Sequence, residues 1–283
     1  MLRITIVLFV SAIFSGSVGS EERKSPKEYQ LTTANHQAYK IYVFEPADAA
    51  RSGSAVITVH GGGWRWGKAE WTFNAAEMFA NAGMLAVAVA YRLSNNDVTP
   101  VEALEDVCET LVWVRERAEK LSVNPHKIAA YGVSAGGHLS ALAATKGCGN
   151  ELGSLSNGGP DLLLLWSPAL DVERDGWFKK LLLGKSSAAD NSPIATLTGA
   201  MPPVSVVQGE LDSLTPMSGA AEFCEKVEAV NGICELNLYE GVGHLLTRNL
   251  ENQESDFDPD PKFVKDGRKK LMSFLEQRGF IDM

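Results

Sequence analysis

Positive charge is in short supply in this 283-residue sequence: 26 lysine and arginine residues stand against 35 aspartate and glutamate residues, a formal net charge of −9. An acidic surface repels phosphate backbones, so a nucleic-acid partner is not expected. Internal repeats, low-complexity tracts and long runs of like charge are missing as well. Apolar residues make up 45% of the chain, enough for the core of one large α/β domain or two small ones.

Cysteine is also scarce, with four residues in the whole chain. Cys108, Cys148, Cys224 and Cys234 do not follow the spacing of a zinc site, and no metal is expected. Cys224 falls on an expected helix and Cys234 begins the expected strand after it, so these two could meet in a disulfide. The sequence alone does not establish whether Cys224 pairs with Cys234, or Cys108 with Cys148.

The chain lacks an apolar run of membrane-spanning length near its start. ITIVLFVSAIF, at residues 4–14, is too short to span a bilayer comfortably. A short cationic start precedes it and the small residues SGSVGS follow, the pattern of a secretory signal peptide rather than of a membrane anchor or a buried helix. We therefore expect residues 1–20 to be removed on export to the periplasm or the cell exterior, leaving residues 21–283 as the folded domain. No cysteine lies near the cleavage zone, so neither a lipid anchor nor stable membrane association is expected.

Beyond this leader, stretches with the pattern of strands alternate with stretches that have the pattern of helices. The expected strands are 39–46, 54–60, 84–92, 127–133, 161–167, 203–210 and 234–240. The expected helices are 71–83, 99–121, 134–147, 219–232 and 263–279. This order predicts an α/β fold with a mostly parallel sheet and helices on both faces. Residues 168–202 show no clear period and are a candidate for a short lid.

The stretch YGVSAGGH, residues 131–138, lies between an expected strand and an expected helix. It contains the G-x-S-x-G pattern of a nucleophile elbow in the structural context that this motif requires. Such a turn would present the hydroxyl of Ser134 above the sheet, and Gly132 and Gly136 would be small because strand and helix cross closely. The alternative is an ordinary strand–helix turn that contains a serine.

A serine is a poor nucleophile without a base and an orienting acid. In the arrangement that goes with this elbow, the acid follows a late strand and the histidine follows the last one. Asp212 lies just past a late expected strand, with Glu210 as its rival, and His244 lies just past the last strand. Ser134, Asp212 and His244 are therefore the candidate catalytic triad.

The chain has five histidines, and only His244 occupies that position. The alternative for His244 is a plain loop residue. His36 and His126 are expected at the surface. His138 lies one helical turn beyond Ser134 and is expected to serve as a packing or capping residue.

Three successive glycines in HGGGW, residues 60–64, follow a buried strand. Glycine is costly to order, so such a run is tolerable only where backbone must come very close to something. Acyl transfer produces a tetrahedral oxyanion that needs preorganised N–H donors. The N–H groups of Gly62, Gly63 and Ala135 are the candidates for this oxyanion hole.

Three further residues are candidates for the substrate pocket. Trp64 and Trp66 are placed to wall the site, although ordinary loop packing is an equal alternative for Trp66. Leu245, directly after His244, is expected to shape the pocket. His60 is expected to brace the glycine loop by hydrogen bonding and not to take part in the chemistry.

Together these motifs resemble the α/β-hydrolase superfamily, and within it the HGGGW … GxSAGGH esterases related to hormone-sensitive lipase and to bacterial acetyl-xylan and feruloyl esterases. The segments VAYRL and CELNLYEGVGH are similar to family segments too, and the resemblance covers nearly all of the mature chain. Two departures stand out. Only about forty residues, which look like strands, separate the leader from His60, whereas lipase-like members carry a helical cap there. The family often reads G-H-G-F where this chain has GHLLTRN.

The resemblance implies a secreted serine ester hydrolase that acts through an acyl-enzyme, without a metal or other cofactor. The expected substrates are short-chain acyl esters, either small molecules or acetyl groups on polysaccharide. One alternative is an amidase or peptidase of the same fold. An alternative of another class is a non-catalytic interaction protein on a hydrolase fold, although such proteins typically lose the serine or the histidine, and both are present here.

Overall fold

The computed structural model of the chain describes residues 25–33, 37–149 and 158–282. The expected signal peptide at residues 1–20 and the expected surface residue His36 lie outside the described residues. Within the described part of the chain, no helix is both long and apolar enough to cross a membrane.

Eight strands of the described chain form a single sheet in the order β1-β2-β4-β3-β5-β6-β7-β8. The first three of these strands pair antiparallel and all the later pairs are parallel. The expected mostly parallel sheet is therefore confirmed. The strands are β1 (Lys27–Thr32), β2 (Ala38–Phe44), β3 (Ala55–Val59), β4 (Leu85–Ala90), β5 (Ile128–Val133), β6 (Leu162–Trp166), β7 (Val204–Gly209) and β8 (Cys234–Tyr239).

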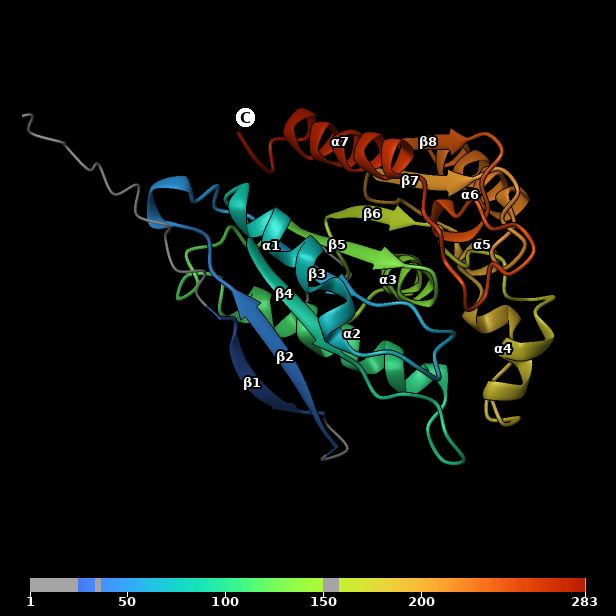
Figure 1. Cartoon of the computed structure of the whole chain (residues 1–283). Coiled ribbons are helices and arrows are strands. Elements are labelled where there is room, and N and C mark those ends of the chain that lie inside the picture. The colour runs from blue at the N-terminus through green and yellow to red at the C-terminus, as the bar shows by residue number, and fades with distance from the viewer. Residues whose placement is uncertain (1–24, 34–36, 150–157, 283) are drawn as a thin grey trace, which may run out of the picture.

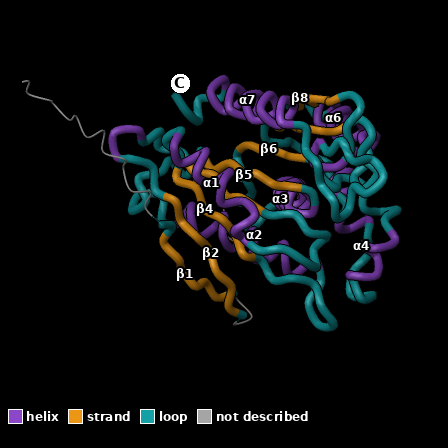
Figure 2. The backbone as a smooth tube through the Cα atoms, in the orientation of Figure 1, coloured by secondary structure: helices purple, strands orange, loops and turns teal. Residues whose placement is uncertain are grey.

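Helices cover both faces of the sheet, as Figures 1 and 2 show. Apolar side chains of α1 and α7 pack on one face, and those of α2, α3 and α6 pack on the other. Every residue of β3 and β6 is buried, because helices lie on both sides of these strands. The helices are α1 (Phe73–Asn81), α2 (Pro100–Glu116), α3 (Ala135–Lys146), α4 (Gly176–Leu181), α5 (Pro193–Thr196), α6 (Met217–Ala229) and α7 (Pro261–Gln277).

The helix expected at 99–121 begins as predicted but is shorter. Thr99 caps α2 in a capping box with Glu102, whose carboxylate accepts the Thr99 N–H at 2.7 Å, and Pro100 occupies the first turn. The helix ends at Glu116, and residues 117–122 continue as turns. Residues 168–202 hold α4, α5 and a short 3-10 turn joined by loops, consistent with the missing period of that segment.

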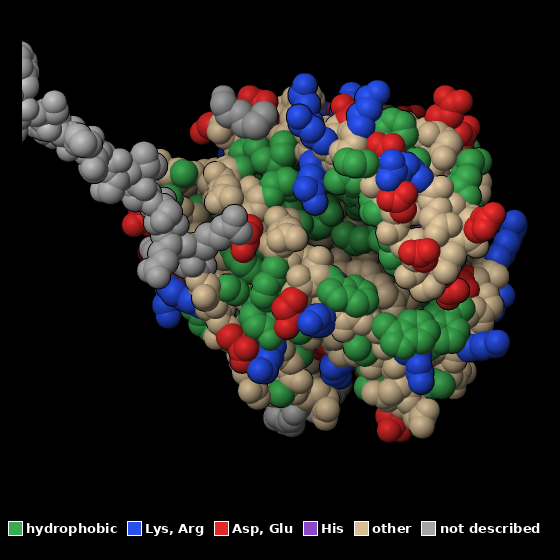
Figure 3. Space-filling view, viewed as in Figure 1, with side chains coloured by type: hydrophobic (Ala, Val, Ile, Leu, Met, Phe, Trp, Pro, Cys, Tyr) green, Lys and Arg blue, Asp and Glu red, His purple; other side chains and the backbone are tan. Residues whose placement is uncertain are grey.

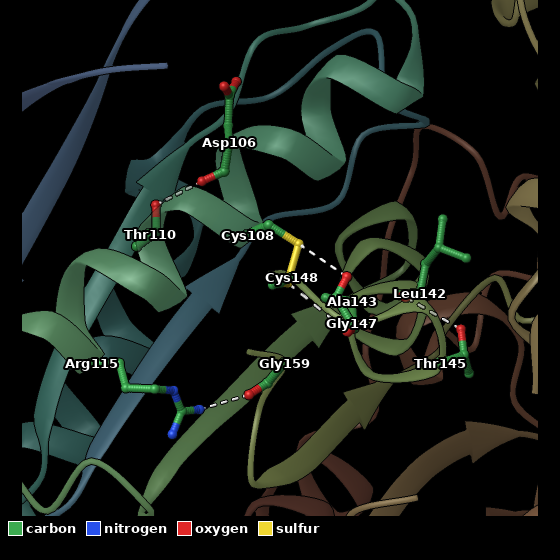
Figure 4. Close-up of a disulfide and its surroundings, with 10 residues drawn as sticks. All are labelled: Asp106, Cys108, Thr110, Arg115, Leu142, Ala143, Thr145, Gly147, Cys148 and Gly159. Atoms are coloured by element: carbon green, nitrogen blue, oxygen red, sulfur yellow. Dashed lines mark hydrogen bonds between the residues drawn. A yellow bond between two sulfur atoms is a disulfide. The ribbon is translucent and has the colours of Figure 1, made fainter. Parts of the chain in front are cut away.

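Both cysteine pairs are joined by disulfides. Figure 4 shows Cys108 on α2 bonded to Cys148, two residues past the end of α3. In the same region, the Arg115 guanidinium of α2 donates to the Gly159 carbonyl at 2.7 Å (Figure 4). Cys224 on α6 is bonded to Cys234 at the start of β8. The first bridge joins α2 to the segment after α3, and the second joins α6 to β8.

Helix α3 lies so close to strands β3 and β5 that Gly132 and Gly136 have no room for a side chain. A Cβ atom on Gly136 would lie 2.1 Å from the Val59 carbonyl oxygen, and one on Gly132 would lie 2.4 Å from the Gly136 carbonyl oxygen. Because both obstacles are backbone atoms, they cannot turn aside as a flexible side chain would. The two glycines of the elbow are small for the reason that the sequence indicates.

We expect Gly136→Ala to lower the free energy of unfolding by about 3 kcal/mol, because the new methyl group would force α3 away from β3. Urea unfolding followed by circular dichroism measures this change. Gly199→Ala is the matched control, since its added Cβ has no neighbour within 4 Å. Equal stability of the two variants would contradict the close crossing.

Candidate active site

The candidate residues meet at one edge of the sheet, where the parallel strands end. HGGGW follows β3, Ser134 follows β5, Asp212 comes shortly after β7 and His244 comes shortly after β8. Carboxyl ends of parallel strands form the crevice in which ligands of open α/β sheets bind. Segments that are far apart in the sequence are thus brought to one site.

Ser134 has the backbone conformation of a strained elbow, with φ 52° and ψ −117°. Residues other than glycine rarely adopt such values, and they persist only where the surrounding structure enforces them. The Ser134 Oγ lies 3.0 Å from Nε2 of His244. The hydroxyl is therefore in hydrogen-bond contact with an imidazole nitrogen that can take its proton.

The second ring nitrogen of His244, Nδ1, lies 2.9 Å from Oδ2 of Asp212. The Asp212 side chain is buried, and its Oδ1 accepts the N–H groups of Leu214 and Thr215 at 3.0 and 2.8 Å. Glu210 is exposed, and its carboxylate accepts the Gly241 N–H at 3.2 Å. Of the two acidic candidates, the structure thus places only Asp212 beside the histidine.

A residue not singled out from the sequence, Gln253, joins the loops that carry the acid and the histidine. Its Oε1 accepts the His244 N–H at 2.8 Å and the Ser213 N–H at 3.1 Å, and its Nε2 donates to the Leu211 carbonyl at 2.9 Å. The side chain is buried, and a Cβ on Gly243 would collide with it. Gln253 therefore links the backbone of His244 to the residues on either side of Asp212.

The glycine loop is held by its carbonyl groups. His60 is buried and its Nδ1 donates to the Gly61 carbonyl at 2.7 Å, while the Gly62 carbonyl accepts the Trp66 N–H at 2.9 Å. In a trans peptide the N–H points away from the C=O of the same unit. Anchoring these two carbonyls therefore turns the N–H groups of Gly62 and Gly63 in the opposite direction.

The three candidate oxyanion donors are free to bind a ligand. Among the described residues, the N–H groups of Gly62, Gly63 and Ala135 have no hydrogen-bond acceptor. All three residues line the same pocket as Ser134. Ala135 is the first residue of α3, so the partial positive charge of a helix N-terminus adds to its N–H. An oxygen anion bound here would receive donors at low reorganisation cost.

The pocket has a volume of about 890 Å³, and its mouth is rich in indole rings. Trp66, Trp71 and Trp177 are 53%, 59% and 37% exposed. The rings of Trp66 and Trp177 stack with centroids 5.4 Å apart, and exposed hydrophobic side chains are visible over α4 in Figure 3. The segment 168–202 supplies Ala169, Asp175 and Trp177 to the wall.

The sequence-predicted pocket residues divide into two kinds. Trp66 and Leu245 border the pocket, Leu245 with a positive φ of 56°. Trp64 also borders it, but its side chain is almost entirely buried and packs inward instead of forming an open wall. His138 is buried, in line with the expected packing or capping position, and His126 is exposed. The described residues contain no cluster of side chains suited to hold a metal ion.

Solved structures with this architecture include an esterase of Thermogutta terrifontis, Est2. Its native form is 26% identical to this chain and superposes with a TM-score of 0.77, covering 92% of this chain and 95% of that one. The same protein has been solved with propionate bound, with butyrate bound and phosphonylated by sarin. The chain has the α/β-hydrolase fold.

Sequence comparisons agree with this fold, but each covers a smaller share of the chain than the match to Est2 does. The BD-FAE family model matches residues 41–160, which include HGGGW and Ser134. Ethyl acetate hydrolase of Pseudomonas putida is 29% identical over 142 residues, 48% of this chain and 43% of that protein. Acetylxylan esterase of Xylanibacter ruminicola is 24% identical over 236 residues, 79% of this chain and 47% of that protein. The chain spans about a third to a half of the length of the first curated relatives that it matches.

Two buried histidines outside the triad, His60 and His138, have pKa values below the ordinary value of histidine. Burial lowers the pKa of His60 to about 4, and it does the same to His138. The hydrogen bonds of these rings to Gly61 and Asn191 act in the opposite direction but are weaker. An unfolded histidine has a pKa of about 6.5. Between these values the unfolded chain binds protons that the folded chain does not.

We therefore expect the free energy of unfolding to fall as the pH is lowered from about 6.5 to about 4, by up to about 3 kcal/mol for each ring. Urea unfolding at the two ends of this range measures the fall. In His138→Gln this fall should be smaller than in the wild type by up to about 3 kcal/mol, because one of the two buried rings is absent. The exposed His126 provides a matched control, and His126→Gln should keep the whole fall. An identical fall in both variants would contradict the burial effect.

Proposed function

We propose that this α/β-hydrolase is a serine carboxylic-ester hydrolase. The observation that carries the proposal is the chain of hydrogen bonds from Ser134 through His244 to Asp212. It borders a pocket lined by three N–H donors that have no acceptor among the residues the structure describes. Relatives named for ethyl acetate, acetylxylan and carboxylic-ester hydrolysis support it, and so does the esterase fold of Est2.

In the proposed reaction, Oγ of Ser134 attacks the ester carbonyl carbon while Nε2 of His244 takes its proton. Asp212 holds the imidazole with its proton on Nδ1 and stabilises the imidazolium that forms. The N–H groups of Gly62, Gly63 and Ala135 stabilise the oxyanion. His244 then protonates the departing alcohol, and water releases the acyl group by the same steps in reverse.

The finer part of the proposal is the substrate: a short acyl group, and in particular acetyl groups on polysaccharide. Relatives carry the names ethyl acetate hydrolase and acetylxylan esterase, and Est2 binds propionate and butyrate. The exposed rings of Trp66, Trp71 and Trp177 line the pocket. Flat apolar faces of this size can stack on other rings, and this supports a substrate whose alcohol part is a sugar ring.

Export is part of the same proposal. The pattern of residues 1–20 predicts a cleaved signal peptide. The two disulfides, Cys108–Cys148 and Cys224–Cys234, support an oxidising destination, because such bonds persist outside the cytosol. A polysaccharide substrate would be met in the same place.

The function is tested with p-nitrophenyl esters from acetyl to palmitoyl, beside acetylated xylan. We expect the highest kcat/KM for acetyl to butyryl esters, because a methylene that fits gains only about 0.8 kcal/mol while one that clashes costs more. Ser134→Ala is the control and should lose turnover by about 10⁴-fold or more. A preference for palmitoyl esters would refute the short-acyl assignment, and undiminished turnover by Ser134→Ala would refute the nucleophile.

A second experiment distinguishes the two acidic residues. Asp212→Asn should lower kcat by about 10⁴-fold, because an amide favours the wrong imidazole tautomer. Glu210→Gln should leave kcat nearly unchanged, because this carboxylate is exposed and contacts the Gly241 N–H instead of the histidine. Both rates are measured near pH 8. The reverse outcome would mean that the acid is Glu210.

A further inference from the structure

His138 lies outside the candidate triad, yet its two ring nitrogens are both bound. The indole N–H of Trp64 donates to its Nδ1 at 3.1 Å, and its Nε2 lies 2.7 Å from the Asn191 carbonyl oxygen. An indole can only donate, so Nδ1 of His138 carries no proton, and Nε2 must donate to the carbonyl. The neighbours thus select one neutral tautomer of this ring.

The ring is enclosed by two aromatic neighbours. The centroids of Trp64 and Phe178 lie 5.2 and 5.0 Å from that of His138, and 4.8 Å from each other. All three side chains are almost completely buried. A buried polar ring is costly unless its nitrogens are bonded, and an apolar residue in its place would leave the Trp64 indole N–H and the Asn191 carbonyl without this partner. Packing alone therefore does not account for a histidine here.

The three rings belong to three parts of the active site. Trp64 follows Gly63, one of the oxyanion donors. His138 lies on the helix that Ser134 caps, and its N–H donates to the Ser134 carbonyl at 3.1 Å. Phe178 lies beside Trp177, whose indole N–H donates to the Gly63 carbonyl at 3.2 Å.

Trp64 needs an anchor because its backbone is strained. Its φ is 61°, a left-handed conformation that a bulky residue rarely adopts. Strain of this kind persists only where contacts of the side chain or backbone enforce it. The hydrogen bonds that the structure describes for Trp64 are the one from its indole to His138 and the one from the Ser94 N–H to its carbonyl, at 2.8 Å. Release of the indole would let this residue relax and would turn the peptide unit between Gly63 and Trp64, which changes the backbone angles of Gly63 next to its N–H donor.

We propose that His138 is a positioning residue for the oxyanion loop: by accepting the Trp64 indole N–H and donating to Asn191, it holds the strained Trp64 and so keeps the Gly63 N–H directed at the reacting oxygen. It acts through Trp64 and touches no substrate. The proposal rests on the function proposed above, since the oxyanion is the one formed in ester hydrolysis. The contacts of His138 with Asn191 and Phe178 also hold the segment 168–202 against the site.

The test uses three variants of the full-length mature protein. Trp64→Phe deletes one N–H and keeps an aromatic ring, and His138→Phe deletes both hydrogen bonds. We expect kcat for p-nitrophenyl acetate to fall by about 10- to 100-fold in both, with KM little changed, since a displaced oxyanion donor affects the transition state most. His138→Gln retains one donor and one acceptor and should recover a large part of the kcat that His138→Phe loses.

Trp113→Phe on α2 is the matched control. This indole contacts Tyr29 and Arg117, away from the pocket, and its loss should leave kcat unchanged. Thermal unfolding of every variant sets an assay temperature at which all are folded. If Trp64→Phe and His138→Phe lose only thermal stability and keep the wild-type kcat, the pair is packing alone and the proposal is wrong. It is equally wrong if His138→Gln is no better than His138→Phe.

A second readout separates this proposal from the proposed function. The rate at which a fluorophosphonate labels Ser134 also depends on the oxyanion donors, but it requires no ester turnover. Failure of the wild type to hydrolyse any ester, with Ser134 still labelled, would refute the function only. The labelling rates of Trp64→Phe, His138→Phe and His138→Gln should then follow the order expected for kcat, and wild-type rates in all three would refute the positioning role.

Discussion

The contact of helix α3 with strand β3 sets the geometry on which the site depends. Gly136 touches the backbone carbonyls of Val59 and His60, so the N-terminus of α3 lies directly against the start of the glycine loop. A Cβ on Gly61 would lie 3.2 Å from the Cβ of Ser134. The nucleophile and two of its oxyanion donors are thus neighbours because two backbones touch, and no flexible side chain intervenes between them.

The local parts of this site could be predicted from the sequence, because their constraints are local. The elbow around Ser134 and the glycines of HGGGW need special backbone conformations that few other residues tolerate, and such needs are visible in a short window. The order of strands and helices predicts the sheet, and the parallel sheet in turn brings Asp212 and His244 to the same edge.

The supporting contacts could not be predicted in this way. Gln253 lies nine residues past His244 in a segment without a regular period, and its partners are backbone groups that every residue possesses. Trp177 and Asn191 reach the glycine loop and His138 only after the chain has passed through β6. Helix α2 ends at Glu116 although its pattern continues, and β1 is a mostly exposed edge strand with few apolar residues. Such features depend on tertiary contacts, which a local pattern does not contain.

The disulfide between Cys108 and Cys148 affects the folding of the segment that carries Ser134. The two cysteines are 40 residues apart, and the loop that they close contains the second half of α2, all of β5, the elbow and all of α3. Closing a loop of this length restrains the unfolded chain by about 4 kcal/mol in the chain-entropy model. Without the bridge, the unfolded chain keeps the full conformational freedom of this segment, and folding must overcome that entropy. Formation of the bridge therefore stabilises the fold that presents Ser134, and the stability of the site depends on the redox state of the surroundings.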